Sequence, residues 1–518
     1  MQRSLPNVQI AVVVSMLLTG AAGAKDLFVA QRDAAANDQN PGTEAQPFKT
    51  IQAGVNAAQP GDTIYVKQGF YEERVKIDKK ARRDAPNALC AWKDDRVYLG
   101  SVPKDAPPSN AWTRIEGTKS WMTTLPEGTP DDVIVLFDGK AQPCESKAEP
   151  PKDAQRQWST YDKATRTLRV NAGGENPAMK HKLTLARLDA GHIEITSESA
   201  SWTIRGIEFG YARGFIGNFG TYITIEDCLF RYAYRRAFFG TGYLSRVRRC
   251  TFDDAAIHGA WGASSLFEDN IFYKGNRTWD EDIQHRVMNY REGSGGFMFK
   301  GLGHGMIVRY NFFDGTSFWP DGDGTVCQVY GNAFHDTFGY GIYNEYGDND
   351  THIIGNYMAN CQAGVASSWS TRMMVIDNFI ESCGSGVIWH NLDKWPLRHS
   401  FMLMRGNAIV GAGVGIMGES GGFDNFPSAW TDAMVDRNRY RLTDNGALTD
   451  LGGKIRSKSI EDLRQRLGWE LHGEAKTYDA ANNDLTPEAL GGGTVTVRLP
   501  VGENSWKSRA MLADPEIN

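Results

Sequence analysis

The sequence predicts an all-β chain that winds into a parallel β-helix, and three observations support this fold class. Asparagines recur at intervals of 21 to 41 residues, each two residues before an apolar or aromatic residue. The apolar runs between them are short and show no helical period, and 56 Gly residues supply many tight turns. A repeat of this size is typical of solenoids, whose coils stack strand on strand. The repeated residues are Asn270, Asn311, Asn332, Asn356, Asn378, Asn407 and Asn438.

The recurring asparagine explains the turn at which it lies. Asn tolerates left-handed backbone angles, and its side-chain amide can hydrogen-bond the next Asn of the stack. Cys228 and Cys250 occupy the same position in two preceding rows. We therefore predict a ladder of amides along one corner of the helix.

Composition and the first residues indicate an exported protein. The chain is 41% hydrophobic and 23% charged, as is ordinary for a globular protein. Arg3, the apolar run 10–18 and Ala22-Gly23-Ala24 predict a signal peptide over residues 1–24, with an N-terminal anchor as the alternative. No later segment is apolar for the roughly 18 residues that a membrane span needs. We expect a periplasmic or secreted monomer, free of the membrane after cleavage.

The charge of the chain argues against one class of partner. Its formal net charge is −6, and it has no basic stripe. Nucleic-acid binding normally requires such a stripe, so we expect no nucleic-acid partner.

Residues 25–80 are predicted to form the N-terminal cap and the first coil. Leu27–Ala30 has a strand pattern, and apolar residues over 48–58 mark one face of a helix. Thr63–Val66 is then the first strand of the solenoid. A helix at this end would cover core and strand edges that the end rung otherwise exposes.

The period vanishes over residues 81–190, where we predict a small inserted β-domain. Val133–Phe137 is continuously apolar, and Thr167–Val170 and Leu183–Ala186 are further strand-like runs. An irregular loop excursion is the alternative. The period resumes in residues 191–445, the predicted main β-helix.

Two further segments complete the predicted organisation. An excursion over 275–295 is rich in polar residues, and long loops on a repeat scaffold commonly shape a binding face. Residues 446–518 contain one helical pattern, from Ile460 to Leu467, and are expected to cover the last rungs.

A column of polar residues is predicted on a second strand of each coil. This strand begins about eight residues after the Asn position, at a Gly in most rows, or at Trp319 in the Asn311 row. Residues at equal places in stacked strands share a side-chain direction. Counting four residues from each start gives Ala263, Lys300, Asp323, Glu345, Ser368, His390 and Glu419. In the Asn311 row, Asp321 could take the place of Asp323.

Two carboxylates of this column suggest a retaining glycoside hydrolase. Asp323 and Glu345 would lie on neighbouring coils, with backbones about 4.8 Å apart. Carboxyl groups about 5–5.5 Å apart suit retention, in which one attacks the anomeric carbon and the other protonates the leaving oxygen. Aromatic residues beside the pair could stack on sugars, and a solvated mixed-charge face is the alternative. These aromatic residues are Trp319, Tyr343, Trp369 and Trp389.

Other residues of the column leave two further functions open. Lys300 or His390 could act as the base of a polysaccharide lyase, which removes the C5 proton of a uronate. Asp321 and Asp323 could hold calcium through oxygen ligands, although we expect no obligatory cofactor. A non-catalytic protein that only binds polysaccharide or oligosaccharide is the third possibility, with Lys300 a solvated surface residue.

Four cysteines form two predicted pairs. Cys228 and Cys250 share a position in neighbouring rows, and Cys361 and Cys383 each follow their row's Asn by five residues. Neighbouring coils are close enough for a disulfide. Buried thiols that fill small core positions are the alternative.

The N-terminal motifs resemble those of secreted right-handed parallel β-helix proteins of the pectate-lyase-like superfamily. The similar motifs are Asn40-Pro41-Gly42-Thr43, Pro47-Phe48-Lys49-Thr50-Ile51-Gln52, Pro60-Gly61-Asp62-Thr63-Ile64-Tyr65-Val66 and Gly69-Phe70-Tyr71. The resemblance implies the fold and its right hand, but not one activity, because the superfamily includes lyases, hydrolases and epimerases.

The excursion ahead of the main rows carries a second resemblance. Phe137-Asp138-Gly139 and Trp158-Ser159-Thr160-Tyr161-Asp162 resemble a β-sandwich inserted in certain β-helix exo-glycosidases. That likeness implies an Asp nucleophile and a Glu acid/base on neighbouring coils, which map onto Asp323 and Glu345.

Overall fold

The computed structural model describes residues 23–486 with gaps. Our predictions for residues 1–22, 275–295 and 487–518 lie outside the described residues. The gaps are 130–132, 142–143, 146–157, 241, 254, 256, 261–263, 274–296, 301–304, 322–325, 338, 348–349, 371, 391–401, 419–432 and 454.

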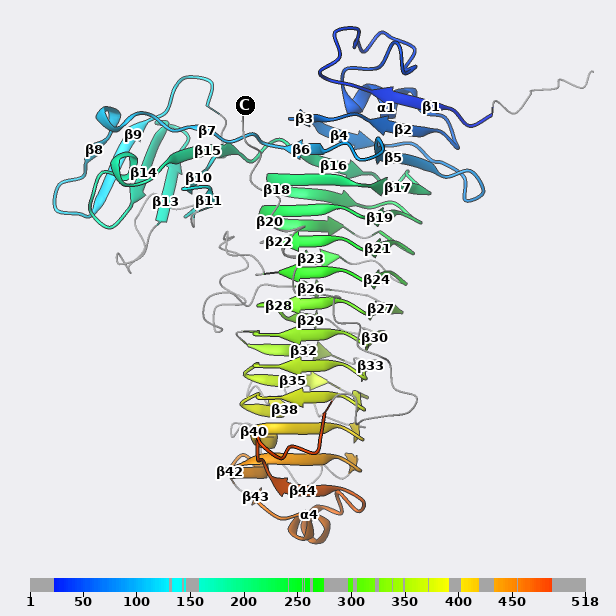
Figure 1. Cartoon of the computed structure of the whole chain (residues 1–518), viewed down its shortest axis with the longest axis vertical. Coiled ribbons are helices and arrows are strands. Elements are labelled where there is room, and N and C mark those ends of the chain that lie inside the picture. Colours follow the sequence, from blue (N-terminus) through cyan, green and yellow to red (C-terminus); the bar gives the residue numbers. More distant parts are fainter. Residues whose placement is uncertain are drawn as a thin grey trace, which may run out of the picture.

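The chain is a right-handed parallel β-helix whose rungs stack along the long axis of the molecule (Figure 1). Each full coil contributes one strand to a 13-stranded sheet and two to a 22-stranded sheet. The larger sheet therefore contains two lines of strands, called line one and line two here in chain order. They count as one sheet because some strands, such as β18 (Ile207–Asn218) and β40 (Ala408–Gly418), run through both lines.

The strands of the 13-stranded sheet are β1 (Asp26–Val29), β2 (Thr63–Val66), β5 (Asn87–Ala91), β17 (Trp202–Arg205), β19 (Thr224–Glu226), β21 (Arg246–Arg248), β24 (Leu266–Glu268), β27 (Met306–Arg309), β30 (Val326–Tyr330), β33 (Asp350–Ile354), β36 (Met374–Ile376), β39 (Leu403–Arg405) and β41 (Met434–Asp436). Line one contains β3 (Gly69–Tyr71), β6 (Val97–Gly100), β18, β20 (Leu229–Gly240), β22 (Thr251–Asp253), β25 (Ile271–Tyr273), β28 (Phe312–Asp314), β31 (Ala333–His335), β34 (Tyr357–Ala359), β37 (Phe379–Glu381), β40, β42 (Arg439–Leu451) and β44 (Glu474–Thr477). Line two contains β4 (Arg74–Ile77), β16 (His192–Ile195), the later parts of β18, β20, β40 and β42, and β23 (Ile257–Ala260), β26 (Phe297–Lys300), β29 (Phe318–Asp321), β32 (Tyr340–Gly347), β35 (Ala363–Ser370) and β38 (Ser385–His390). A final strand, β43 (Ile455–Ser457), pairs antiparallel to β42.

The predicted asparagine ladder is confirmed. At each step the backbone N–H and the side-chain Nδ2 of one Asn donate to Oδ1 of the next, as from Asn311 to Asn332 at 2.9 and 3.0 Å. Nδ2 also donates to a carbonyl of the preceding coil, such as Phe267 O at 3.0 Å. All seven residues are buried. Because every buried amide is satisfied along the stack, the ladder fixes the register of successive coils.

Our explanation for the asparagine turn is wrong in one respect. The left-handed backbone belongs to the residue before each Asn, as at Asp269 (φ 55°), Tyr310 (φ 57°) and Gly331 (φ 65°), and to none of the seven Asn residues. The Asn is therefore required for its amide hydrogen bonds alone. The residue before the Asn adopts the unfavourable positive φ, and this residue is Gly in three rows.

A stack of phenylalanine rings fills the core beside the ladder. Successive rings lie parallel, with centroids 4.5–4.9 Å apart and interplanar angles of 8–15°. They occupy the position two residues after the Asn slot, so the spacing of the sequence repeat becomes a continuous aromatic column. The members are Phe209, Phe230, Phe252, Phe272, Phe313 and Phe334.

Helix α1 (Ile51–Ala57) covers the N-terminal end, as predicted. The Thr50 side chain accepts the Ala53 N–H at 3.2 Å and thereby caps the helix. The Glu73 carboxylate accepts the N–H groups of Ile51 and Gln52, the first two residues of the helix. This contact ties α1 to the first coil.

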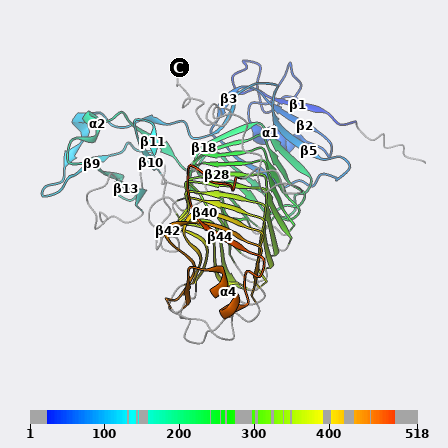
Figure 2. The ribbon, with the colours of Figure 1, turned by 60° about the horizontal axis from the view of Figure 1, so that its bottom comes forward.

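Helix α4 (Ile460–Leu467) covers the C-terminal end (Figure 2). Glu470, which follows the helix, terminates the ladder. The Glu470 carboxylate accepts the backbone N–H of Asn438 at 3.1 Å, its Nδ2 at 2.7 Å and the Tyr440 hydroxyl at 2.7 Å. The two carboxylate oxygens thus replace the Oδ1 of a further Asn. Across the described part of the chain, none of the helices has the length and apolarity to span a bilayer.

A small two-sheet unit lies beside the N-terminal rungs (Figures 1 and 2). Its strands are β7 (Lys104–Asp105), β8 (Thr113–Arg114), β9 (Ser120–Thr124), β10 (Val133–Phe137), β11 (Lys140–Ala141), β12 (Cys144–Glu145), β13 (Trp158–Asp162), β14 (Thr167–Asn171) and β15 (Leu183–Arg187), with a turn of 3-10 helix at Ser109–Ala111 and helix α2 (Pro177–Lys180). One sheet has the order β11-β10-β15-β7 and the other β12-β13-β14-β9-β8.

The start of this unit differs from our expected range of 81–190. Strands β5 and β6 fall in that range but belong to the coils, because they pair in register with β2 and β17 and with β3 and β18. The insertion therefore begins after Gly100. The coil containing β5 and β6 carries no Asn at the ladder position, so the repeat did not reveal it.

The continuously apolar strand β10 is explained by two buried faces. Val135 and Phe137 pack in the core between the two sheets of the insertion. Ile134 and Leu136 point the other way and pack with Tyr211 of the β-helix. Alternate residues thus serve the insertion's own core and its docking onto the helix.

Candidate functional site

The candidate site is a column of residues on five successive strands of line two. The register pairs Lys300 with Asp321, Asp321 with Glu345, Glu345 with Ser368, and Ser368 with His390. Neighbouring members are therefore separated by one rung, about 4.8 Å. The side chains of Lys300, Asp321 and Glu345 lie outside the described residues, as does that of Trp369 in β35.

The register puts Asp321, not Asp323, opposite Glu345. Our count began the Asn311 row at Trp319, but Phe318 is the residue that pairs with Ile342 and fills the core. The turn between β28 and β29 is shorter than in the following rows, so the strand begins about two residues earlier. Asp323 lies outside the described residues, and the column position we gave it belongs to Asp321.

An aromatic cluster lies next to the column, on the strands that carry Asp321 and Glu345. Trp319 and Tyr343 precede Asp321 and Glu345 by two residues, and their ring centroids are 4.9 Å apart. Tyr340 adds a third ring, 5.2 Å from Tyr343. All three side chains are buried and form a cluster separate from the main core. The expected positions of Trp319 and Tyr343 beside the column are thus observed.

His390 and Ser368 contact this cluster. The His390 ring lies 5.3 Å from Tyr340 and 5.8 Å from Tyr343, edge to face with the latter. The Tyr343 hydroxyl and Ser368 Oγ are hydrogen-bonded at 2.8 Å. Both His390 and Ser368 are buried. The arrangement packs an imidazole and two hydroxyls against aromatic rings beside the column.

Trp389 does not belong to the site, contrary to our expectation. It is 1% exposed and packs in the main core, with its ring edge to face with Trp469 at 6.0 Å. Its neighbours Ile388 and His390 face the outer cluster instead. Successive side chains of a strand point to opposite faces, so a Trp adjacent in sequence to a column residue faces inward.

Sequence reasoning missed Tyr340. It lies directly before Gly341, the residue at which the strand was expected to begin, and it contacts His390 from two strands away. The signal that could have found it is the run Tyr340-Gly341-Ile342-Tyr343, with two tyrosines around one core position.

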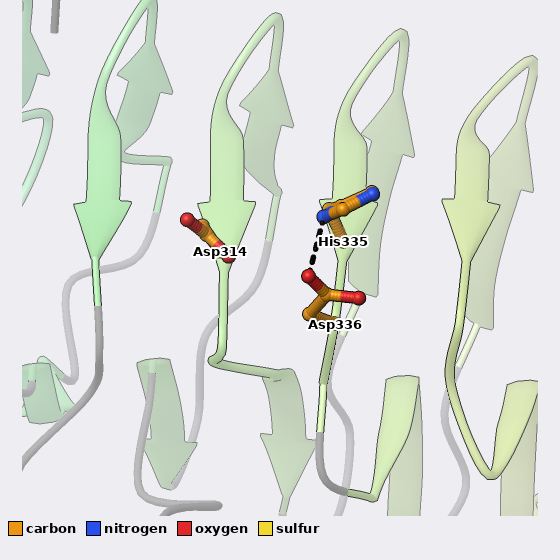
Figure 3. A group of neighbouring side chains, drawn as sticks. All are labelled: Asp314, His335 and Asp336. Carbon is orange, nitrogen blue, oxygen red and sulfur yellow. Dashed lines mark ion pairs between the residues drawn. The ribbon is translucent and has the colours of Figure 1, made fainter. Parts of the chain in front are cut away.

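A second group of polar side chains lies at the corner between lines one and two. Asp314, His335 and Asp336 each offer a ligand atom, and these atoms lie within 4.8 Å of one another (Figure 3). His335 Nδ1 is 3.1 Å from Asp336 Oδ2, and Asn360 Nδ2 donates to Asp336 Oδ1 at 3.0 Å. One imidazole and two carboxylates are donors that a divalent metal ion accepts. Asp314 and His335 occupy the same position in their rows, three residues after Asn311 and Asn332.

Comparison with known proteins supports the fold. Residues 34–77 match the family model described as a protein of unknown function, DUF1565. The structure described as XylC in complex with xylose matches with a TM-score of 0.55 and 15% identity, covering 87% of this chain and 86% of that one. A search of curated protein sequences finds no match.

Two more distant structures also match over much of their length. The lacto-N-biosidase from Eubacterium ramulus has a TM-score of 0.40 and 11% identity, covering 88% of this chain and 67% of that one. Pectate lyase Pel9A has a TM-score of 0.37 and 12% identity, covering 81% and 80%. At 15% identity, the likeness to the XylC structure describes the fold and leaves the activity to the site.

Proposed function

We propose that this chain is a carbohydrate-active enzyme, a retaining glycoside hydrolase that uses Asp321 and Glu345. The observation that carries the proposal is the direct pairing of these two acidic residues on neighbouring strands. One rung brings their backbones about 4.8 Å apart. That spacing suits carboxyl groups about 5–5.5 Å apart, the separation of retaining enzymes rather than inverting ones.

The two residues would take complementary roles. The Asp321 carboxylate attacks the anomeric carbon while Glu345 donates a proton to the leaving glycosidic oxygen, so the C–O bond breaks and a glycosyl ester forms. Glu345, now a carboxylate, takes a proton from water as that water attacks the anomeric carbon and releases Asp321. Two like charges one rung apart disfavour double ionisation, which helps keep one carboxyl protonated as the acid.

The aromatic cluster supports a sugar as the substrate. Trp319 and Tyr343 lie two residues before the acids, and their buried rings pack together as apolar support beside them. His390 is three rungs from Asp321, about 14 Å along the column at 4.8 Å per rung. We assign His390 and Ser368, which are buried against the tyrosine rings, to support of the sugar-binding face and not to proton transfer.

A polysaccharide lyase is the second candidate, and the pairing of Lys300 with Asp321 favours it. Lys300 lies one rung from an acid on the same face and could take the proton at C5 of a uronate. Such an enzyme yields an unsaturated product that absorbs ultraviolet light. A hydrolase yields new reducing ends without that absorbance.

Aryl glycosides and oligosaccharides test the proposal, beginning with xylosides because the XylC structure was solved with xylose. We expect Asp321→Asn and Glu345→Gln each to lower kcat/KM by at least about a thousandfold, as expected when a nucleophile or an acid is removed. Asp323→Asn is the matched control and should stay within a few-fold of the parent. Loss of activity in Asp323→Asn alone would contradict the register assignment.

Added azide separates the two roles. With Asp321→Ala, azide should restore turnover and give a glycosyl azide of inverted configuration. With Glu345→Ala, azide should attack the glycosyl enzyme and give the retained configuration. Absorbance of an unsaturated uronate would instead favour the lyase, and binding of sugar without any product would favour a non-catalytic protein.

A further inference from the structure

Four of the seven cysteines lie in two stacked pairs. The first pair is Cys361 and Cys383. Two residues before these cysteines Ala359 pairs with Glu381, and two residues after them Ala363 pairs with Ser385. The turns between have equal lengths, so Cys361 lies one rung from Cys383. The Gly384 N–H donates to the Cys361 carbonyl at 3.1 Å, which holds the two turns together.

The second pair lies at the corner of the asparagine ladder. The second pair is Cys228 and Cys250. Glu226 pairs with Arg248 on one side of these cysteines and Leu229 pairs with Thr251 on the other, so Cys228 lies one rung from Cys250. The Cys250 N–H donates to Asn270 Oδ1, the first carbonyl of the ladder. The two cysteines thus occupy the corner at the point where amide hydrogen bonds between coils stop.

All four residues are free thiols inside the protein and are at most 5% exposed. Their sulfurs lie against backbone carbonyls, with Cys361 Sγ 3.3 Å from Ala359 O and Cys250 Sγ 3.4 Å from Arg248 O. Burial raises the pKa of Cys250. Neighbouring rungs are about 4.8 Å apart. That distance falls within the Cα separation of about 4.4–6.8 Å found in disulfides.

Cys327 provides an internal comparison. It is fully buried, and its partners on the neighbouring rungs are Met306 and Thr351. It therefore shares burial with the paired cysteines but has no cysteine at the stacked position.

We propose that Cys228–Cys250 and Cys361–Cys383 are sites of disulfide formation between successive coils. Two thiols of a pair lose two protons and two electrons to form one S–S bond, and a disulfide oxidant such as oxidised glutathione is reduced to two thiols. Because the finished fold buries both pairs, the exchange takes place while the coils stack. The Cys361–Cys383 bond would join the turns that lead into β35 and β38, the strands carrying Ser368 and His390.

The test uses the full chain exported to a bacterial periplasm, and the same chain reduced, unfolded and refolded with reduced and oxidised glutathione. Free thiols are alkylated under denaturing conditions and disulfides are mapped on peptides without reduction. We expect both cross-linked peptides and three alkylated cysteines of the seven in the sequence. Seven alkylated cysteines in folded protein from both preparations, or bonds between other cysteines, would overturn the proposal.

Two single variants make the count specific. Cys383→Ser should lose one cross-linked peptide. Cys361 then remains a free thiol, so four cysteines should be alkylated. Cys327→Ser should keep both cross-linked peptides and give two alkylated cysteines. Circular dichroism establishes that each variant is folded before its thiols are counted. An unchanged peptide map in Cys383→Ser would contradict the Cys361–Cys383 pair.

Discussion

Trp319 and Trp389 show how one residue's position in a strand decides its role. Both lie close in sequence to column residues, and both were candidates to bind a sugar. Trp319 packs with Tyr343 in the outer cluster, whereas Trp389 packs with Trp469 in the core. Aromatic type and proximity to the column could be read from the sequence. The face could not, because it changes with every residue along a strand.

Conservative substitutions should separate the two tryptophans. Trp389→Phe should lower the free energy of unfolding by about 1–3 kcal/mol through lost packing, with KM within twofold of the parent. Trp319→Phe should raise KM several-fold, because the buried ring packs against Tyr343 beside the two acids and supports the site. Urea denaturation and steady-state kinetics on the same preparations measure both quantities. A KM effect confined to Trp389→Phe would contradict the assignment of faces.

At the scale of single elements, the asparagine ladder and its end are the main features. The ladder was predictable because its chemistry repeats, with the same side chain bonding its own copy one coil later. Its last partner was not predictable. Glu470 lies 32 residues beyond Asn438 and outside any repeat, and only the return of the chain behind α4 brings it to the corner.

The buried Glu470 should leave a mark on the pH dependence of stability. Burial raises the pKa of its carboxyl above the ordinary value of 4.5, although its three hydrogen bonds act in the opposite direction. The unfolded chain therefore releases this proton at a lower pH than the folded chain. The stabilising contribution is complete below the unfolded pKa and is lost as the pH rises through the folded pKa.

Urea denaturation across about pH 4 to 7 should show that the free energy of unfolding of the parent protein decreases as the pH rises. In Glu470→Gln the component should be absent, and at pH values where the parent carboxyl is ionised the variant should be less stable by about 1–3 kcal/mol because one acceptor for Asn438 is lost. Glu461→Gln, an exposed glutamate on α4, is the matched control and should keep the pH dependence of the parent. An identical pH profile in Glu470→Gln and the parent would exclude the effect.

At the scale of the whole molecule, the inserted unit is a separate core docked on the helix. Its internal core includes Val135 and Phe137, while Ile134 and Leu136 contact Tyr211. The sequence indicated strands and a buried run in this region. It could not show that one strand serves two cores, because a run apolar on both faces carries no information about what covers each face.

Weakening the docked face should therefore release the unit without unfolding it. Leu136→Ala should remove about 2–5 kcal/mol of packing free energy, mostly from the contact with the helix. We expect faster limited proteolysis in the connections before β7 and after β15, with the released unit still folded. Met122→Ala, at a partly exposed position of β9, should cleave at the parental rate. Unfolding of the unit together with its release would show that the two cores are not independent.

The sequence by itself determined the stacked coils, the ladder, both end helices and the strands that carry the candidate column. These features follow from side chains that repeat at a fixed spacing or from local helix signals. Tertiary structure alone decided that Asp321 pairs with Glu345, that Trp389 faces inward and that Glu470 ends the ladder. The physical reason is that a strand's register depends on its turn length and on which residue fills the core, and a shift of one residue reverses every face.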